Sequence, residues 1–113
     1  MATNQGTVDF IREQLGAVAG VSARKMFGEY ALYVGSKVVA LVCDDILYLK
    51  PTRSAVELMA NPVEGFPYPG ARSHFVVTDE LDDPDRLSVL VKRVAEDLPE
   101  PKPKKPKTKK PAD

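Results

Sequence analysis

Hydrophobic and polar residues alternate in short runs between positions 22 and 51. Turn pairs interrupt these runs at Gly28-Glu29, Gly35-Ser36 and Asp44-Asp45. β-Branched, aromatic and aliphatic residues fill the runs, which is typical of an antiparallel meander joined by tight turns. The pattern therefore predicts four strands, over residues 23–27, 30–34, 37–43 and 46–50.

The third run is apolar on both of its faces. One face carries Val38, Ala40 and Val42, and the other carries Val39, Leu41 and Cys43. Strands with this pattern usually lie in the middle of a sheet and are covered on both sides. We expect a helix to cover one side, and a second helix or another subunit to cover the other.

Apolar residues at helical spacing precede and follow the strands. A stripe over residues 8–18 predicts a first helix, with Thr7 as its N-cap and an end near Gly20. Thr52 caps a short second helix, which Asn61-Pro62 stops. Asp83-Pro84 is a strong start for a last helix, whose buried stripe is Leu87, Leu90, Val91, Val94 and Leu98.

Residues 61–71 contain three prolines and two glycines, so they are expected to form a loop. Within it, Phe66 and Tyr68 are expected to form a short strand or a packed lid, and residues 73–78 a last strand. The order is then α-β-β-β-β-α-β-α. It predicts an α+β fold, in which three helices pack on an antiparallel meander of four to six strands.

The formal net charge of zero hides a division of charge along the chain. Residues 99–113 hold six lysines against two acidic side chains, whereas residues 1–98 hold 10 basic and 14 acidic ones. Five prolines in that terminal segment disfavour helix and sheet. We predict a folded domain over residues 1–98 and a disordered Lys/Pro-rich tail over residues 99–113.

Three interpretations of this tail are open. An extended cationic arm suits the phosphate backbone of DNA or RNA, which it would bind without reading sequence. The arm is equally a solubilising segment, and Pro103-Lys104-Lys105-Pro106 is a weak match to proline-rich docking motifs. The candidate phosphate contacts are Lys102, Lys104, Lys105, Lys107, Lys109 and Lys110.

Four basic residues of the folded part are also candidates for anion contact. Arg24-Lys25 lies in the first predicted strand, and Lys50 and Arg53 follow the fourth. If those two strands lie close together, the residues form a patch for phosphate or an acidic partner. The alternative is a solvated sheet edge, where cations discourage aggregation. The tyrosines are expected to be packing residues, with Tyr30 and Tyr48 facing the core.

The chain offers little for catalysis or metal binding. His74 is its only histidine and Cys43 its only cysteine, so the two cannot complete a zinc site or a disulfide. The acidic residues at positions 79–85 suit the start of the last helix better than a calcium loop. We expect no enzyme activity, no cofactor and no metal. Without a signal sequence or a long apolar run, we expect a cytoplasmic protein that does not enter a membrane.

The order of motifs resembles the N-terminal domain of the TfoX/Sxy family of bacterial competence regulators, over about residues 7–98. The matching residues are Arg24, Met26-Phe27-Gly28, Tyr30, Leu32-Tyr33, the apolar strand at 38–42, Leu47-Tyr48-Leu49-Lys50 and Phe66-Pro67-Tyr68. The chain departs from the pattern at Glu29 and Ala31, where many relatives have glycine. It also has the Lys-Pro tail where longer relatives carry a helical C-terminal domain.

The resemblance implies an α+β domain similar to secretion-chaperone and YjbR-type domains, with no catalytic activity. It implies a regulatory or adaptor protein that acts by protein–protein contact, with a role in transcription or competence. The expected partner is an unidentified protein or a second copy of the chain. The alternative function is non-specific binding to nucleic acid through the tail.

Overall fold

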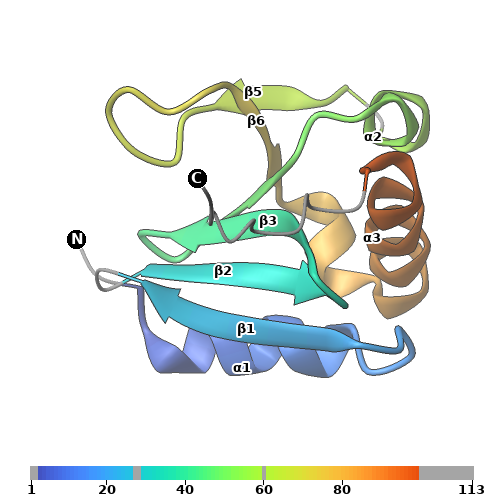
Figure 1. The fold of residues 1–113 in the computed structure, drawn as a ribbon, viewed down its shortest axis with the longest axis horizontal. Coiled ribbons are helices and arrows are strands. Elements are labelled where there is room, and N and C mark those ends of the chain that lie inside the picture. The colour runs from blue at the N-terminus through green and yellow to red at the C-terminus, as the bar shows by residue number, and fades with distance from the viewer. Residues whose placement is uncertain (1–2, 27–28, 60, 100–113) are drawn as a thin grey trace, which may run out of the picture.

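The computed structural model describes residues 3–26, 29–59 and 61–99 (Figure 1). In chain order its elements are α1 (Gln5–Gln14), β1 (Val21–Met26), β2 (Glu29–Val34), β3 (Lys37–Cys43), β4 (Ile46–Leu49), α2 (Arg53–Leu58), β5 (Val63–Gly65), β6 (His74–Val77), the 3₁₀ turn η1 (Asp79–Asp82) and α3 (Pro84–Asp97). The strands form one antiparallel sheet of order β1-β2-β3-β4-β6-β5. The predicted α+β fold is confirmed.

The start of the first helix differs from the prediction. Asn4, not Thr7, is the N-cap, because its side chain accepts a hydrogen bond from the Gly6 N–H at 2.9 Å. The Thr7 hydroxyl instead donates to Asp45 in the β3–β4 turn, at 2.9 Å. The helix also ends earlier than expected, at Gln14, although Val18 still packs against the core.

The predicted caps of the other two helices are confirmed. Thr52 accepts a hydrogen bond from the Ala55 N–H at 3.4 Å, and Asp83 accepts one from the Arg86 N–H at 3.2 Å.

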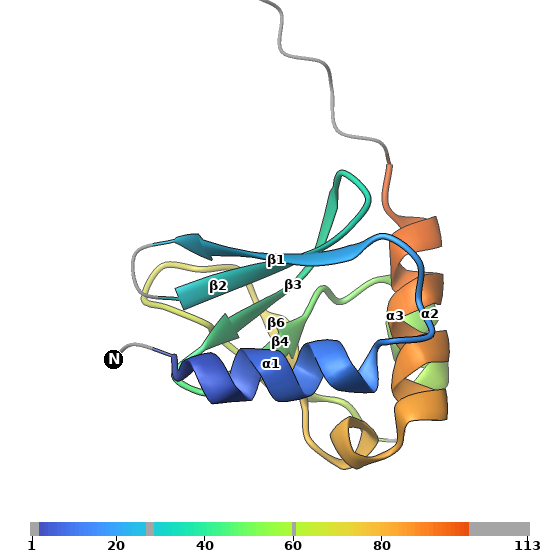
Figure 2. The same ribbon diagram turned by 90° about the horizontal axis from the view of Figure 1, so that it is seen from below.

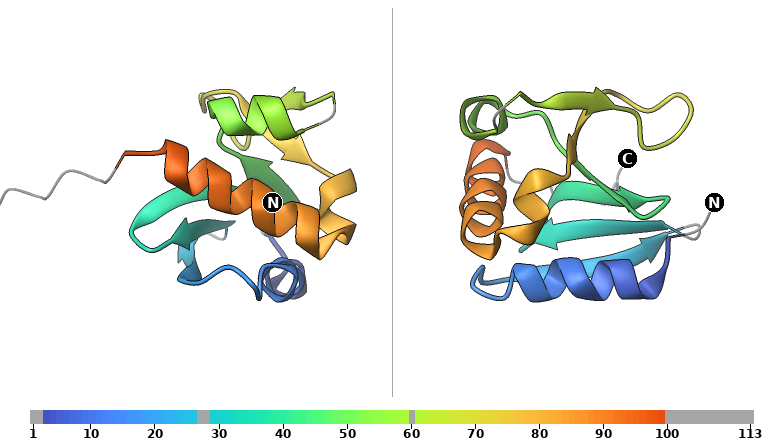
Figure 3. Two further views of the ribbon diagram at one scale, coloured as in Figure 1. Left: turned by 90° about the vertical axis from the view of Figure 1, so that its right-hand side faces the viewer. Right: turned by 180° about the vertical axis from the view of Figure 1, so that it is seen from behind.

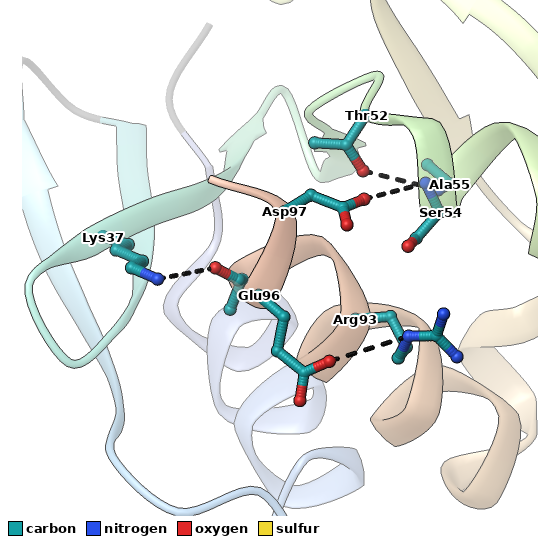
Figure 4. A network of polar contacts seen from close by, with 8 residues as sticks. Lys37, Thr52, Ser54, Ala55, Arg93, Glu96 and Asp97 are labelled. Atoms are coloured by element: carbon teal, nitrogen blue, oxygen red, sulfur yellow. Dashed lines mark hydrogen bonds and ion pairs between the residues drawn. The ribbon is translucent and has the colours of Figure 1, made fainter. Parts of the chain in front are cut away.

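Figure 4 shows how the end of α3 is joined to α2 and to β3. The Ser54 N–H donates to Asp97 at 2.8 Å, and the Lys37 ammonium donates to the Ala95 carbonyl at 2.9 Å.

One face of the sheet carries the core. Cross-strand partners share a face of a sheet, and one row of partners crosses all six strands: Ala23, Leu32, Ala40, Leu49, Phe75 and Glu64. Its first five members pack with the buried faces of α1 and α3. In Figures 1 and 2, α1 runs beside β1, and α3 stands across the ends of the strands. Each fully buried leucine in this core contributes about 2 kcal/mol of hydrophobic stabilisation.

The opposite face, which we call the open face, is defined by a second row of partners: Arg24, Ala31, Leu41, Tyr48, Val76 and Val63. No helix of the described chain crosses it in Figure 1, and Figure 3 shows the helices on other sides of the sheet. The central position of β3 is confirmed, but helices cover only one of its two faces. Ala31 and Tyr48 are nevertheless buried, and the Tyr48 ring lies against Gly65 of the neighbouring segment.

The segment between α2 and β6 corrects another expectation. The short strand there is β5, which ends before Phe66 and Tyr68 rather than containing them. Both aromatic side chains are exposed, so they do not form a packed lid. Gly65, the last residue of β5, allows close packing, because a Cβ atom there would lie 3.0 Å from Cε1 of Tyr48. The β5–β6 loop, residues 66–73, therefore starts from a tightly packed point on the open face.

Candidate functional site

The open face is hollowed beside the β1–β2 connection. The hollow has a volume of about 530 Å³, and its lining residues are Met26, Glu29, Tyr30, Leu41, Cys43 and Tyr68. These residues come from the end of β1, the start of β2, the middle and end of β3, and the β5–β6 loop. Three parts of the sequence that are far apart thus meet at one place.

Apolar side chains reach the solvent around this hollow. Two of its lining residues, Met26 and Tyr68, are 42% and 55% exposed. Phe66 is not one of the lining residues, but it lies on the same loop as Tyr68 and is 62% exposed. Isolated exposed apolar residues are normal, but a group of them around a depression marks a site for a ligand or for another protein. The hollow is therefore suited to an apolar side chain or ligand group.

A set of hydrogen bonds around Glu29 and Thr3, which we call the polar clasp, joins three segments of the chain beside the hollow. The Glu29 carboxylate accepts hydrogen bonds from the Thr3 hydroxyl and from the Asp44 N–H, the latter at 3.2 Å. The buried Thr3 hydroxyl also lies 3.0 Å from the Val42 carbonyl oxygen. Asp44 and Asp45 adopt positive φ values of 53° and 62°, as a tight turn of the I′ type requires. Glu29 thereby joins the N-terminal segment to the β3–β4 turn.

The chemistry of the hollow is not that of a nucleophile. Burial raises the pKa of the Cys43 thiol, and the negative charge of Glu29 raises it further. The thiol is therefore protonated at neutral pH, whereas a reactive cysteine needs a lowered pKa. This agrees with the place of Cys43 on an apolar face of the third predicted strand.

The tyrosines of the sheet have mainly structural positions. Tyr30 is buried in the core, as predicted, and its hydroxyl donates a hydrogen bond to the Gln5 side chain at 2.8 Å. Tyr48 is also buried, but the prediction that it faces the core is wrong, because its cross-strand partners Leu41 and Val76 place it on the open face. Tyr33 is half-buried, and the Arg24 guanidinium lies 5.6 Å from the centre of its ring. That distance is within the range of a cation–π contact.

The four basic candidates do not come together. β1 and β4 are separated by β2 and β3, so Arg24 and Lys50 lie about 14 Å apart across the sheet, at ~4.8 Å per strand. Arg53 lies on α2 and pairs with Glu57 at 3.7 Å. Burial lowers the pKa of Lys50. Arg24 and Lys25 remain neighbours on β1, while the six lysines of the tail lie outside the described residues.

The remaining titratable candidates are structural. His74 is buried, and its Nδ1 lies 2.8 Å from the Arg72 carbonyl oxygen. Glu80 is buried and pairs with Arg86 at 3.5 Å. Among the residues that the structure describes, no three histidine, cysteine or acidic side chains are placed to hold a metal ion. None of the helices found in those residues combines the length and apolar character needed to cross a membrane.

Comparison with known proteins decides the family. The family model of the TfoX N-terminal domain matches residues 13–98. The chain belongs to the TfoX N-terminal domain family. It is also 44% identical over 111 residues to an uncharacterized 12.7 kDa protein in the trpE 5′ region of Spirochaeta aurantia. That match covers 98% of this chain and 96% of the relative.

The fold gives the residues of the family pattern different surroundings. Leu47 and Leu49 are core residues, and Phe27 and Gly28 lie outside the described residues. Met26, Tyr30 and Tyr68 line the hollow. A larger hollow of about 620 Å³ beside the β2–β3 turn contains none of the residues quoted for the pattern. The hollow on the open face is therefore the better candidate site.

Sequence reasoning missed this site. It treated Met26, Tyr30 and Tyr68 as separate parts of a pattern. It placed Leu41 and Cys43 on the second face of β3, which a helix or another subunit was expected to cover. The signal that was available is the apolar character of both faces of β3, because a strand with two apolar faces and helices on only one of them leaves a surface for a partner.

Proposed function

We propose that this chain is a non-catalytic regulatory or adaptor module that acts by protein–protein contact through the open face. The observation that carries the proposal is the hollow lined by Met26, Leu41 and Tyr68. Its exposed apolar rim resembles the centre of a protein interface, where aromatic residues and methionine are enriched. Membership in the TfoX N-terminal domain family supports a role in transcription or competence-related regulation in the cytoplasm.

Position-specific crosslinking tests the proposal. A photoreactive phenylalanine analogue is placed at Tyr68 in one variant and at Phe10 in the other. Phe10 is a matched control, because it is an aromatic residue 40% exposed on α1. After nuclease treatment of the cells, we expect a discrete adduct with another protein from position 68 and none from position 10. Equal labelling from both positions, or only non-specific labelling from position 68, would contradict the proposal.

The second candidate function is non-specific binding of nucleic acid through residues 99–113, which hold six lysines. Each lysine–phosphate contact releases counterions, so binding is expected to weaken with salt, with a log–log slope of up to about −5. Deletion of residues 99–113 is expected to abolish this binding. Undiminished DNA binding by the truncated protein would exclude the tail as the contact.

A further inference from the structure

β1 is a long edge strand that pairs with another strand on one side only in the described structure. It pairs with β2 over all six of its residues without a bulge, and it stands at one end of the strand order. Seen from below in Figure 2, β1 runs beside α1 along the free edge of the sheet. The opposite edge strand, β5, has only three residues. β1 is therefore the edge at which the sheet can be extended.

The hydrogen-bonding register shows which backbone groups of β1 are free. The Gly35 N–H donates to the Gly20 carbonyl at 2.9 Å, just before β1 begins. Hydrogen-bonded pairs alternate along an antiparallel ladder, so the N–H and C=O groups of Ser22, Arg24 and Met26 point toward β2. The N–H and C=O groups of Val21, Ala23 and Lys25 then point away from the sheet. No hydrogen bond to these outward groups is found within the described chain.

The edge lacks most of the devices that protect edge strands. β1 contains no proline and no bulge, and four of its six residues are exposed while the other two are half-buried. The protection that it has is the positive charge of Arg24 and Lys25, which lie on opposite faces of the strand. No acidic residue occurs in β1. Positive charge repels cationic strands and selects acidic ones.

The same charges disfavour a second copy at this edge. An antiparallel pair of β1 strands centred on Ala23 places the two Arg24 side chains on one face at diagonal positions, about 7–8 Å apart. Registers centred on Arg24 or Lys25 place like charges directly opposite each other, which is destabilising. The lysine-rich segment 99–113 is repelled for the same reason. An acidic segment of a different protein is instead attracted by Arg24 and Lys25, away from the start of β1, where Asp9 and Glu13 of α1 line a hollow with Val21.

We propose that β1 accepts an extended acidic segment of another protein as an additional strand. Its backbone pairs with Val21, Ala23 and Lys25, and its carboxylates lie beside Arg24 and Lys25. Met26 ends β1 and lines the hollow, so a segment continuing past it brings an apolar side chain to that site. This inference rests on the proposed function, and it names the chemistry of the partner.

Amide hydrogen exchange with a defined probe tests the inference. The probe is a short synthetic peptide of alternating valine and glutamate, and the control peptide has lysine in place of glutamate. On addition of the acidic peptide to the full chain, we expect the amides of Val21, Ala23 and Lys25 to exchange at least about tenfold more slowly. The already bonded amides of Ser22 and Arg24 should not change, and the lysine peptide should have no effect.

Two variants separate strand pairing from simple charge attraction. Ala23→Pro removes a backbone N–H that points away from the sheet and leaves the hydrogen bonds to β2 in place. It is expected to abolish the slower exchange that the peptide causes at alternate residues of β1, whereas Ala23→Ser is expected to keep it. The double variant Arg24→Glu/Lys25→Glu is expected to weaken binding of the acidic peptide roughly tenfold and to keep the fold.

Three results would overturn the inference. The first is binding of the acidic peptide without slower amide exchange at alternate residues of β1. The second is slower exchange that grows with protein concentration in the absence of peptide, and the third is no binding of the acidic peptide. The second result would assign the edge to a second copy of the chain. If the peptide fails while position 68 still crosslinks a partner protein, the edge proposal falls and the proposed function stands.

Discussion

Replacement of Gly65 by alanine tests how the β5–β6 loop is held against the open face. A Cβ atom at this position would lie 2.7 Å from Cγ2 of Val76 and 3.0 Å from Cε1 of Tyr48. Both neighbours are stiff, because Val76 is β-branched and the Tyr48 ring is buried. The methyl group therefore forces a shift of the ring or of the β5 backbone.

The magnitude follows from two opposing terms. Overpacking of this kind costs about 1–3 kcal/mol. Loss of the glycine's freedom in the unfolded chain offsets about 0.5–1 kcal/mol of that cost. We expect Gly65→Ala to lower the free energy of unfolding by about 1–2 kcal/mol.

A double-mutant cycle, measured by urea denaturation, tests whether the contact with Val76 causes this loss of stability. Val76→Ala removes the closer of the two contacts, so Gly65→Ala is expected to cost about 1 kcal/mol less in that background. A neutral or stabilising Gly65→Ala, or strict additivity of the two substitutions, would refute the claim that β5 packs tightly on Tyr48 and Val76.

Two further predictions concern polar contacts. Thr3→Val removes the hydroxyl that hydrogen-bonds to Glu29 and Val42 while keeping the shape of the side chain. It should lower the free energy of unfolding, measured by urea denaturation, by about 1–2 kcal/mol. An unchanged free energy of unfolding would show that the polar clasp does not stabilise the fold. The hydrogen bond from the Ser54 N–H lowers the pKa of Asp97, so its stabilisation is present above the ordinary pKa of the carboxyl, near pH 4, and is lost as the pH falls through the lowered value. The difference in thermal stability between the wild type and Asp97→Asn should therefore shrink as the pH falls below about 4, and a difference that persists in acid would contradict this assignment.

Local signals predicted most of the fold. The turn pairs and alternating residues between positions 22 and 51 predicted the four strands of the meander to within two residues. Asp83-Pro84 marked the start of α3, because the cap and the proline each act within one turn of helix. The start of α1 was misplaced because Thr7 binds Asp45, a partner distant in sequence that local cap preferences do not reveal.

The candidate site depends on contacts that local patterns do not encode. Tyr68 reaches the hollow beside Met26 because β6 inserts between β4 and β5, which brings the β5–β6 loop over the open face. No periodicity within residues 61–71 specifies that strand order. The separation of Arg24 from Lys50 has the same origin, since it follows from the positions of β1 and β4 in the sheet.

Methyl NMR of the methionines tests the central claim most directly. The Met26 side chain lines the hollow and is 42% exposed, whereas Met59 is 6% exposed in the core and serves as an internal control. On titration with the protein crosslinked at position 68, we expect the Met26 methyl signal to shift and the Met59 signal to stay in place. Saturable binding that leaves the Met26 signal unmoved would show that the partner does not use the hollow.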